Sequence, residues 1–265
     1  MWRSELRLVF RRRRTLVLLA VLAAVPVLAA VAIRVSGSAS AGGPPFLADI
    51  THNGVFAALA GLALALGFLL PLSVSVVAGD AIAGEAGLGT LRYLLVRPVG
   101  RTRLLAAKFG VVVVFCLVAA LMVAGAGLVI GAVLFPVGRV TTISGFSISL
   151  TTGVLRTLEA AGIVGVSMVG LAAIGLFIST LTEAPLAAMA GTLVFWIAVQ
   201  IADSVPQLAS IHPVLFTDHW SSFVDLLRLP VGYSSVEADL LLQGCWGLVF
   251  VLAAWARFTT ADILA

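Results

Sequence analysis

Charged residues are scarce in this sequence, and lysine is almost missing. Of its 265 residues, 11% are charged and 61% are hydrophobic, and the mean hydropathy is +1.17. A soluble domain needs far more polar surface than this composition provides, so the soluble classes are excluded. Lysine occurs once, at Lys108, beside fifteen arginines. We interpret this bias as a property of the source genome and attach no mechanism to it.

Several kinds of reactive site are missing as well. The two cysteines, Cys116 and Cys245, both lie in apolar runs, which argues against a disulfide framework or a metal cluster. A nucleotide-binding P-loop needs Gly-Lys-Ser/Thr, but Lys108 is flanked by Ala107 and Phe109. No HExxH motif occurs either. The chain is therefore expected to be no enzyme, to hydrolyse no ATP itself and to hold no cofactor or metal.

Long apolar runs fill most of the sequence instead. Several reach the roughly 20 residues needed to cross a bilayer as a helix, and the ten-residue alternating segments of an outer-membrane barrel are absent. The runs predict an all-α integral membrane protein, because each helix satisfies its own backbone in lipid. We expect one transmembrane domain over residues 1–265. Its six spans lie at about 15–33, 54–78, 109–135, 158–179, 186–202 and 240–256.

Residues 1–14 precede the first span and predict an amphipathic helix on the membrane surface. Arg3, Arg7 and Arg11 recur every four residues, and Trp2 falls on another face. A plainer interpretation, compatible with the first, is a positive cluster that orients the first span. That span is long enough to cross the membrane, so we expect it to stay uncleaved rather than to act as a signal peptide.

Arginine and lysine are unevenly divided between the two sides of the expected bundle. With the N-terminus inside, six precede the first span, five lie between the second and third spans and one follows the sixth, twelve in all, whereas the other loops hold four. Basic residues collect in cytoplasmic loops, so both termini of this multi-pass protein of the cell membrane are expected in the cytoplasm. The net charge of +4 then reflects topology, and no nucleic acid partner is expected.

Within these boundaries no ionisable residue lies deep inside a span. The nearest are Asp80, Glu159, Glu183 and Asp203, all at expected span ends. Ion-coupled pumps usually need such groups inside the membrane. The pattern therefore argues against a self-powered pump, and any transport would draw its energy from a partner.

The loop at 203–239 contains apolar residues spaced by four, three and four. These are Phe216, Trp220, Phe223 and Leu227. With Asp218 as the N-cap, the spacing predicts a short amphipathic helix on the outer membrane face, anchored in the interface by Trp220. Docking of an outside partner and simple shielding of the bundle are both open roles for this helix.

The charged segment 80–108, between the second and third spans, predicts a short cytoplasmic helix. Thr90 can cap its start and Pro98 ends it, with leucines along one face. Such a helix can dock in a groove of a soluble protein. The other interpretation is an interfacial loop whose arginines lie at lipid headgroups.

This segment resembles the signature between the second and third helices of ABC-2 type permeases. The matching residues are Glu85, Gly89, Thr90, Leu91, Leu94, Leu95, Pro98, Arg101 and Lys108. The tail, with Phe258 followed by Asp262 and Ile263, is similar to the ending of many of these permeases. One departure is Gly87, where many members carry a second acidic or polar residue, and it weakens the case for a paired acidic site.

The resemblance implies a permease subunit that pairs with an identical or homologous subunit and binds two cytoplasmic ATPase subunits, which hold the ATP and magnesium. It also implies that the N-terminal helix and the helix within 80–108 contact the ATPase. The implied interface residues are Glu85, Gly89, Thr90, Arg97, Pro98 and Arg101. A packing role is open for each, such as pairing of Glu85 with a nearby arginine.

Three functions are compatible with these features. The first is the membrane subunit of an ATP-driven transporter, with export as the expected direction and membrane lipid around it. The second is a non-transporting anchor or assembly factor that recruits an outside protein through residues 203–239. The third is a membrane-embedded enzyme that acts on lipids through the outer histidines, such as His212 and His219, with Asp218 or Asp225, although no metal-ligand spacing recurs.

Overall fold

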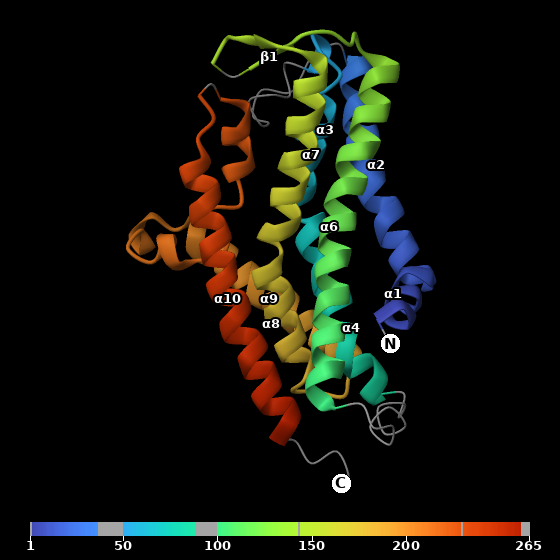
Figure 1. The fold of residues 1–265 in the computed structure, drawn as a ribbon, viewed down its shortest axis with the longest axis vertical. Coiled ribbons are helices and arrows are strands. Elements are labelled where there is room, and N and C mark those ends of the chain that lie inside the picture. Colours follow the sequence, from blue (N-terminus) through green and yellow to red (C-terminus); the bar gives the residue numbers. More distant parts are fainter. Residues whose placement is uncertain (1, 37–49, 88–99, 143, 229, 261–265) are drawn as a thin grey trace.

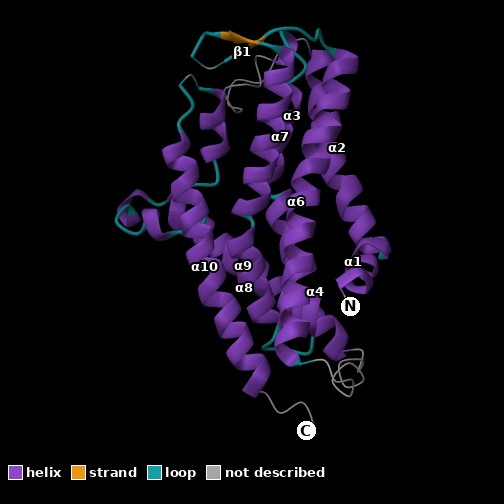
Figure 2. Cartoon of the chain, in the orientation of Figure 1, coloured by secondary structure: helices purple, strands orange, loops and turns teal. Residues whose placement is uncertain are grey.

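The computed structural model describes residues 2–36, 50–87, 100–142, 144–228 and 230–260, which form a bundle of long helices (Figure 1). Helix dominates this part of the chain, and the strands in it are very short (Figure 2). Six helical stretches are long and apolar enough to cross a membrane. The protein is therefore a multi-pass helical membrane protein, and the number of membrane-spanning helices agrees with the six predicted.

The helices follow one another with few interruptions. Their bounds are α1 (Trp2–Arg11), α2 (Arg13–Ser36), α3 (Phe56–Gly67), α4 (Leu69–Gly87), α6 (Arg101–Leu134), α7 (Leu150–Ser167), α8 (Val169–Ser179), α9 (Pro185–Ser204) and α10 (Tyr233–Thr260). An antiparallel hairpin of β1 (Val140–Thr141) and β2 (Ser147–Ile148) lies between α6 and α7. Its turn uses Gly145, whose φ of +80° is rarely adopted by residues with a side chain.

The bundle has two distinct ends. At one end, called the base below, α4 ends at Gly87, α6 begins at Arg101 and α10 ends at Thr260; the hairpin lies at the other end, called the top (Figure 1). Helix α6 packs against α2, α3 and α7. Near the top its Gly131 contacts the backbone of Gly54, because small residues let two backbones approach closely.

Two spans that were expected to be single helices are broken. The second consists of α3 and α4, separated at Phe68, and the fourth consists of α7 and α8, separated at Met168. Pro71 accounts for the first break, because proline has no N–H to continue the hydrogen-bond ladder. At the second break, Gln243 of α10 accepts a hydrogen bond from the N–H of Gly170, in the first turn of α8.

Several helices extend past the predicted boundaries and include charged residues. Helix α4 continues to Gly87, α6 already begins at Arg101, and α10 begins at Tyr233 and so contains Asp239. Asp239 is 0% exposed and lies within a helix long and apolar enough to cross the membrane, so the predicted sixth span began too late to include it. The boundaries failed because a hydropathy pattern ends a span at each charge, whereas a charge with partners can remain inside the helix.

The segment between α9 and α10 also differs from the prediction. It contains the short 3-10 helices η2 (Pro206–Leu208), η3 (His212–Val214) and η4 (Ser222–Leu227), not an amphipathic α-helix. The four apolar residues assigned to that helix, Phe216, Trp220, Phe223 and Leu227, are all buried. Trp220, only 5% exposed, is therefore not an interfacial anchor. Phe216 packs against the rings of Trp220 and Trp246, at centroid distances of 5.6 and 5.4 Å, and this aromatic burial determines the local structure.

Candidate coupling site at the base of the bundle

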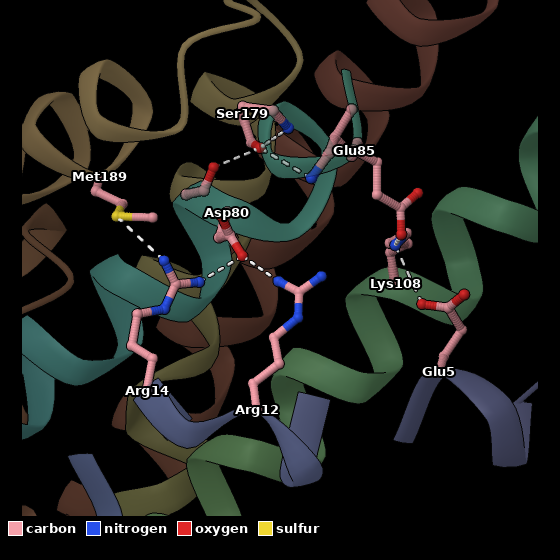
Figure 3. Close-up of polar contacts among 11 residues, drawn as sticks. Glu5, Arg12, Arg14, Asp80, Glu85, Lys108, Ser179 and Met189 are labelled. Atoms are coloured by element: carbon pink, nitrogen blue, oxygen red, sulfur yellow. Dashed lines mark hydrogen bonds and ion pairs between the residues drawn. The ribbon is translucent and has the colours of Figure 1, made fainter. Parts of the chain in front are cut away.

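One lysine joins three helices near the base. Nζ of Lys108 on α6 lies 3.1 Å from Oε2 of Glu5 on α1, and it donates a hydrogen bond to Oε1 of Glu85 on α4 (Figure 3). Lys108 is 6% exposed, and both carboxylates are nearly as buried. Because a buried charge is tolerated only with partners, these contacts determine where α1 lies against α4 and α6.

A second ion cluster lies close by on α4. Asp80 accepts hydrogen bonds from Arg12 and Arg14, and both guanidinium groups reach the same oxygen, Oδ2 (Figure 3). Arg12 lies between α1 and α2, and Arg14 lies in the first turn of α2. The two arginines therefore attach the α1–α2 junction to α4.

The two clusters have opposite net charges. The Lys108 cluster contains one base and two acids, whereas the Asp80 cluster contains one acid and two bases. A cavity of about 20 Å³ is lined by members of both, including Glu5 and Arg12, and has room for about one water molecule. The six groups together are neutral. A displacement of α4, which carries Asp80 and Glu85, separates opposite charges in both clusters.

The described structure covers only part of the predicted coupling residues. Glu85 belongs to the Lys108 cluster. Arg101 also lies at the base, but it donates to the carbonyls of Phe258 and Thr259, at 3.3 and 3.0 Å, and so caps the end of α10. Gly89, Thr90, Arg97 and Pro98 lie outside the described residues. Glu85 and Arg101 thus reach one end of the bundle but make different contacts there.

Helix α1 is amphipathic, as predicted, and its basic row faces away from the bundle. Arg3, Arg7 and Arg11 are exposed, whereas Glu5 on the opposite face is buried. Trp2 is 48% exposed, and its ring packs on Gly110 of α6, where any larger residue would collide with the indole. Trp2 is therefore a contact with the bundle, and the arginine row is available to the membrane surface.

Sequence reasoning missed Glu5, Arg12 and Arg14 as members of this site. One usable signal exists in α1, where Glu5 is an acid on the face opposite the arginine row. The pairing of Glu5 with Lys108 has no local signal, because it joins the first helix to a residue about a hundred positions later, just before the third predicted span.

A second buried polar cluster joins α7, α8 and α10. Ser167 donates to Asp239, and the amide of Gln243 donates to Oδ1 of Asp239 at 3.1 Å and to the carbonyl of Phe216 at 2.7 Å. Twelve helical residues, a rise of about 18 Å, separate Ser167 from Ser179 beside Asp80. This cluster therefore lies well inside the bundle and stabilises the break between α7 and α8.

The residues considered for lipid chemistry lie between α9 and α10. Nδ1 of His219 lies 3.1 Å from Oδ2 of Asp218, while Asp225 pairs with Arg228 at 3.1 Å and accepts a hydrogen bond from Ser235. Among the described residues, no group of three or more His, Cys, Asp or Glu is placed to hold a metal ion. The structure thus places His219 beside Asp218, whereas Asp225 has other partners.

Fold and site together define a class, a multi-pass helical membrane protein whose N-terminal helix is ion-paired to the base of its bundle. Residues 19–264 match the family described as protein of unknown function (DUF2705), and the chain belongs to this family. No curated protein matches the chain. Helix α1 and the arginines that attach it to α4 precede the matched range.

Proposed function

We propose that this chain is the permease subunit of an ATP-driven transporter, with energy from a separate cytoplasmic ATPase and with export as the direction. The base site is the main support, because six charged groups tie α1 and the α1–α2 junction to the two helices that flank segment 88–99. In ABC-2 type permeases, which segment 80–108 resembles, the ATPase contacts these two regions. The complete transporter then contains a second permease subunit, two ATPase subunits and surrounding membrane lipid.

The base site can transmit a movement of the ATPase subunits from α1 to the bundle. Lys108, Glu5 and Glu85 are buried, so α1 cannot move away from the bundle without breaking the buried contact between Glu5 and Lys108. A force applied to α1 by closing ATPase subunits is therefore passed to α4 and α6 as rigid units. Movement of those helices reorients the bundle.

The test is reconstitution with the partner. The tagged chain, purified in mild detergent, should carry a P-loop ATPase with it, and ATPase stimulation should depend on the base site. Glu85→Gln keeps the side-chain size and removes the charge facing Lys108, so we expect stimulation to fall about tenfold while membrane insertion stays normal. Arg103→Gln, at an exposed position of α6, is the matched control. A stable chain without any ATPase partner, or full stimulation in the Glu85 variant, contradicts the proposal.

Asp239 favours a second candidate function, transport coupled to an ion gradient. Acidic residues inside spans commonly serve as ion or proton relays, and Asp239 is fully buried within α10. In proteoliposomes without an ATPase, substrate movement driven by an imposed proton gradient and lost in Asp239→Asn would support this candidate. Absence of gradient-driven movement in the unaltered chain would reject it.

A further inference from the structure

A side chain at the end of α8 bonds to three backbone groups of α4. Oγ of Ser179 donates to the carbonyl of Gly79 at 2.7 Å and accepts from the N–H groups of Ile82 and Ala83 at 3.0 and 2.9 Å (Figure 3). The carbonyl of Gly79 and the N–H of Ala83 are one helical turn apart on α4. The hydroxyl therefore attaches one turn of α4 to the end of α8.

The surroundings hold this hydroxyl firmly in place. Ser179 is the last residue of α8 and is 1% exposed, so water does not compete for its contacts. Gly79 packs so closely on α9 that an added Cβ would lie 2.7 Å from the backbone nitrogen of Met189. Helix α4 therefore has no room to shift toward α9 at this turn.

The Ser179 contacts lie at the charged end of α4. Asp80 directly follows Gly79, and Glu85 lies two residues beyond Ala83. We infer that Ser179 is a positioning residue whose hydroxyl holds the last turns of α4 so that both carboxylates meet their basic partners. This inference concerns the base site itself, so it holds whether or not an ATPase drives the protein.

Helix α8 carries this hydroxyl at its last residue, and its first turn is attached to α10 through Gln243. Helix α8 therefore links the base site to the polar cluster around Asp239.

The experiment uses the full chain in detergent, with Ser179→Ala to remove the hydroxyl. Two measurements follow the variant: the trypsin cleavage rate within 11–14, and the spin-label distance between positions 86 and 103 with Cys116 and Cys245 replaced by alanine. We expect cleavage to rise about fivefold to thirtyfold, as the junction loses its anchor, together with a shifted distance distribution. Asp80→Asn removes the charge that Arg12 and Arg14 contact, so it gives the reference cleavage rate for an α1–α2 junction detached from α4.

The matched control is Ser75→Ala. Ser75 is a buried serine of the same helix, but its hydroxyl donates to the carbonyl of Pro71 within α4. It should leave both measurements unchanged. If the Ser179→Ala protein does not fold, Ser179→Cys carries the test, since a thiol makes weaker hydrogen bonds and should give intermediate values. Wild-type cleavage and distance, or faster cleavage without a shifted distance, would overturn the inference.

Discussion

At the scale of single residues, Lys108 is the cation that compensates two buried carboxylates. Its ammonium group lies between Glu5 and Glu85, and all three side chains are nearly inaccessible to water. If the lysine charge is removed, two carboxylates remain buried near each other, and each has lost a cation. Burial of uncompensated charge is much more costly than loss of an exposed ion pair.

Lys108→Met should therefore destabilise the protein strongly. Methionine keeps the length of the side chain and removes the charge, so we expect a loss of about 3–5 kcal/mol in the free energy of unfolding. Thermal unfolding in detergent would show this as a lower midpoint. Arg103→Met, at an exposed position of the same helix, is the control and should change stability by less than about 0.5 kcal/mol.

The triple variant Glu5→Gln, Glu85→Gln and Lys108→Met separates charge from packing. It leaves no charge buried in this cluster, so most of the lost stability should return. If it is as unstable as the single variant, the loss comes from the packing of the lysine stem and the electrostatic explanation is wrong.

At the scale of elements, Gln243 joins parts of the chain that are far apart in sequence. Its amide oxygen accepts from Gly170 at the start of α8, and its amide nitrogen donates to the carbonyl of Phe216. The side chain is 1% exposed, so both backbone groups lack water as a substitute partner. A residue on α10 thus attaches the segment 205–228 and supports the broken fourth span.

Gln243→Leu should loosen the segment 205–228 selectively. Leucine fills a similar volume but leaves two buried backbone groups unsatisfied, at a cost of about 1–3 kcal/mol for each. We expect faster amide hydrogen exchange across this segment, measured by mass spectrometry. Gln207→Leu, an exposed glutamine within the same segment, should leave the exchange unchanged. Equal exchange in the two variants would contradict the role given to Gln243.

The apolar pattern predicted where the long helices lie, but it did not predict where they break. Helix α9 begins at Pro185, one residue before the predicted fifth span, because proline suits the first turn of a helix. The break at Met168 was missed because its stabilising partner, Gln243, lies on another helix. The segment around Phe216 was assigned to the membrane surface because its spacing fits a helix, and spacing alone does not tell which partner covers an apolar face.

The base site shows the same division between local and distant information. Glu85 was found through its place in a motif. Its ion pair with Lys108, and the contact of Lys108 with Glu5, depend on how three helices pack. Asp80 was noted only as a charge at a span end, although it holds two arginines from the α1–α2 junction. Pairing of charges is a tertiary property, so a sequence pattern identifies candidates but not partners.

At the scale of the whole molecule, the helices place the N-terminal helix and the end of α10 toward the same end of the bundle (Figure 1). The distribution of arginine and lysine predicts that this end is cytoplasmic. Some basic residues contribute more than orientation, since Arg156, expected in a loop, lies in α7 and donates to the carbonyl of Leu226 at 3.1 Å. The exposed row on α1 keeps its charge free for the membrane surface.

Cysteine labelling in intact cells tests this orientation. In a background with Cys116 and Cys245 replaced by alanine, Ser147→Cys places a thiol on the exposed hairpin and Arg257→Cys places one near the base. A membrane-impermeant maleimide should label the hairpin thiol in intact cells and the basal thiol only after permeabilisation. The reverse pattern would put the ion clusters outside the cell, where no ATP-bound partner could push on them, and would refute the proposed energy source along with the topology.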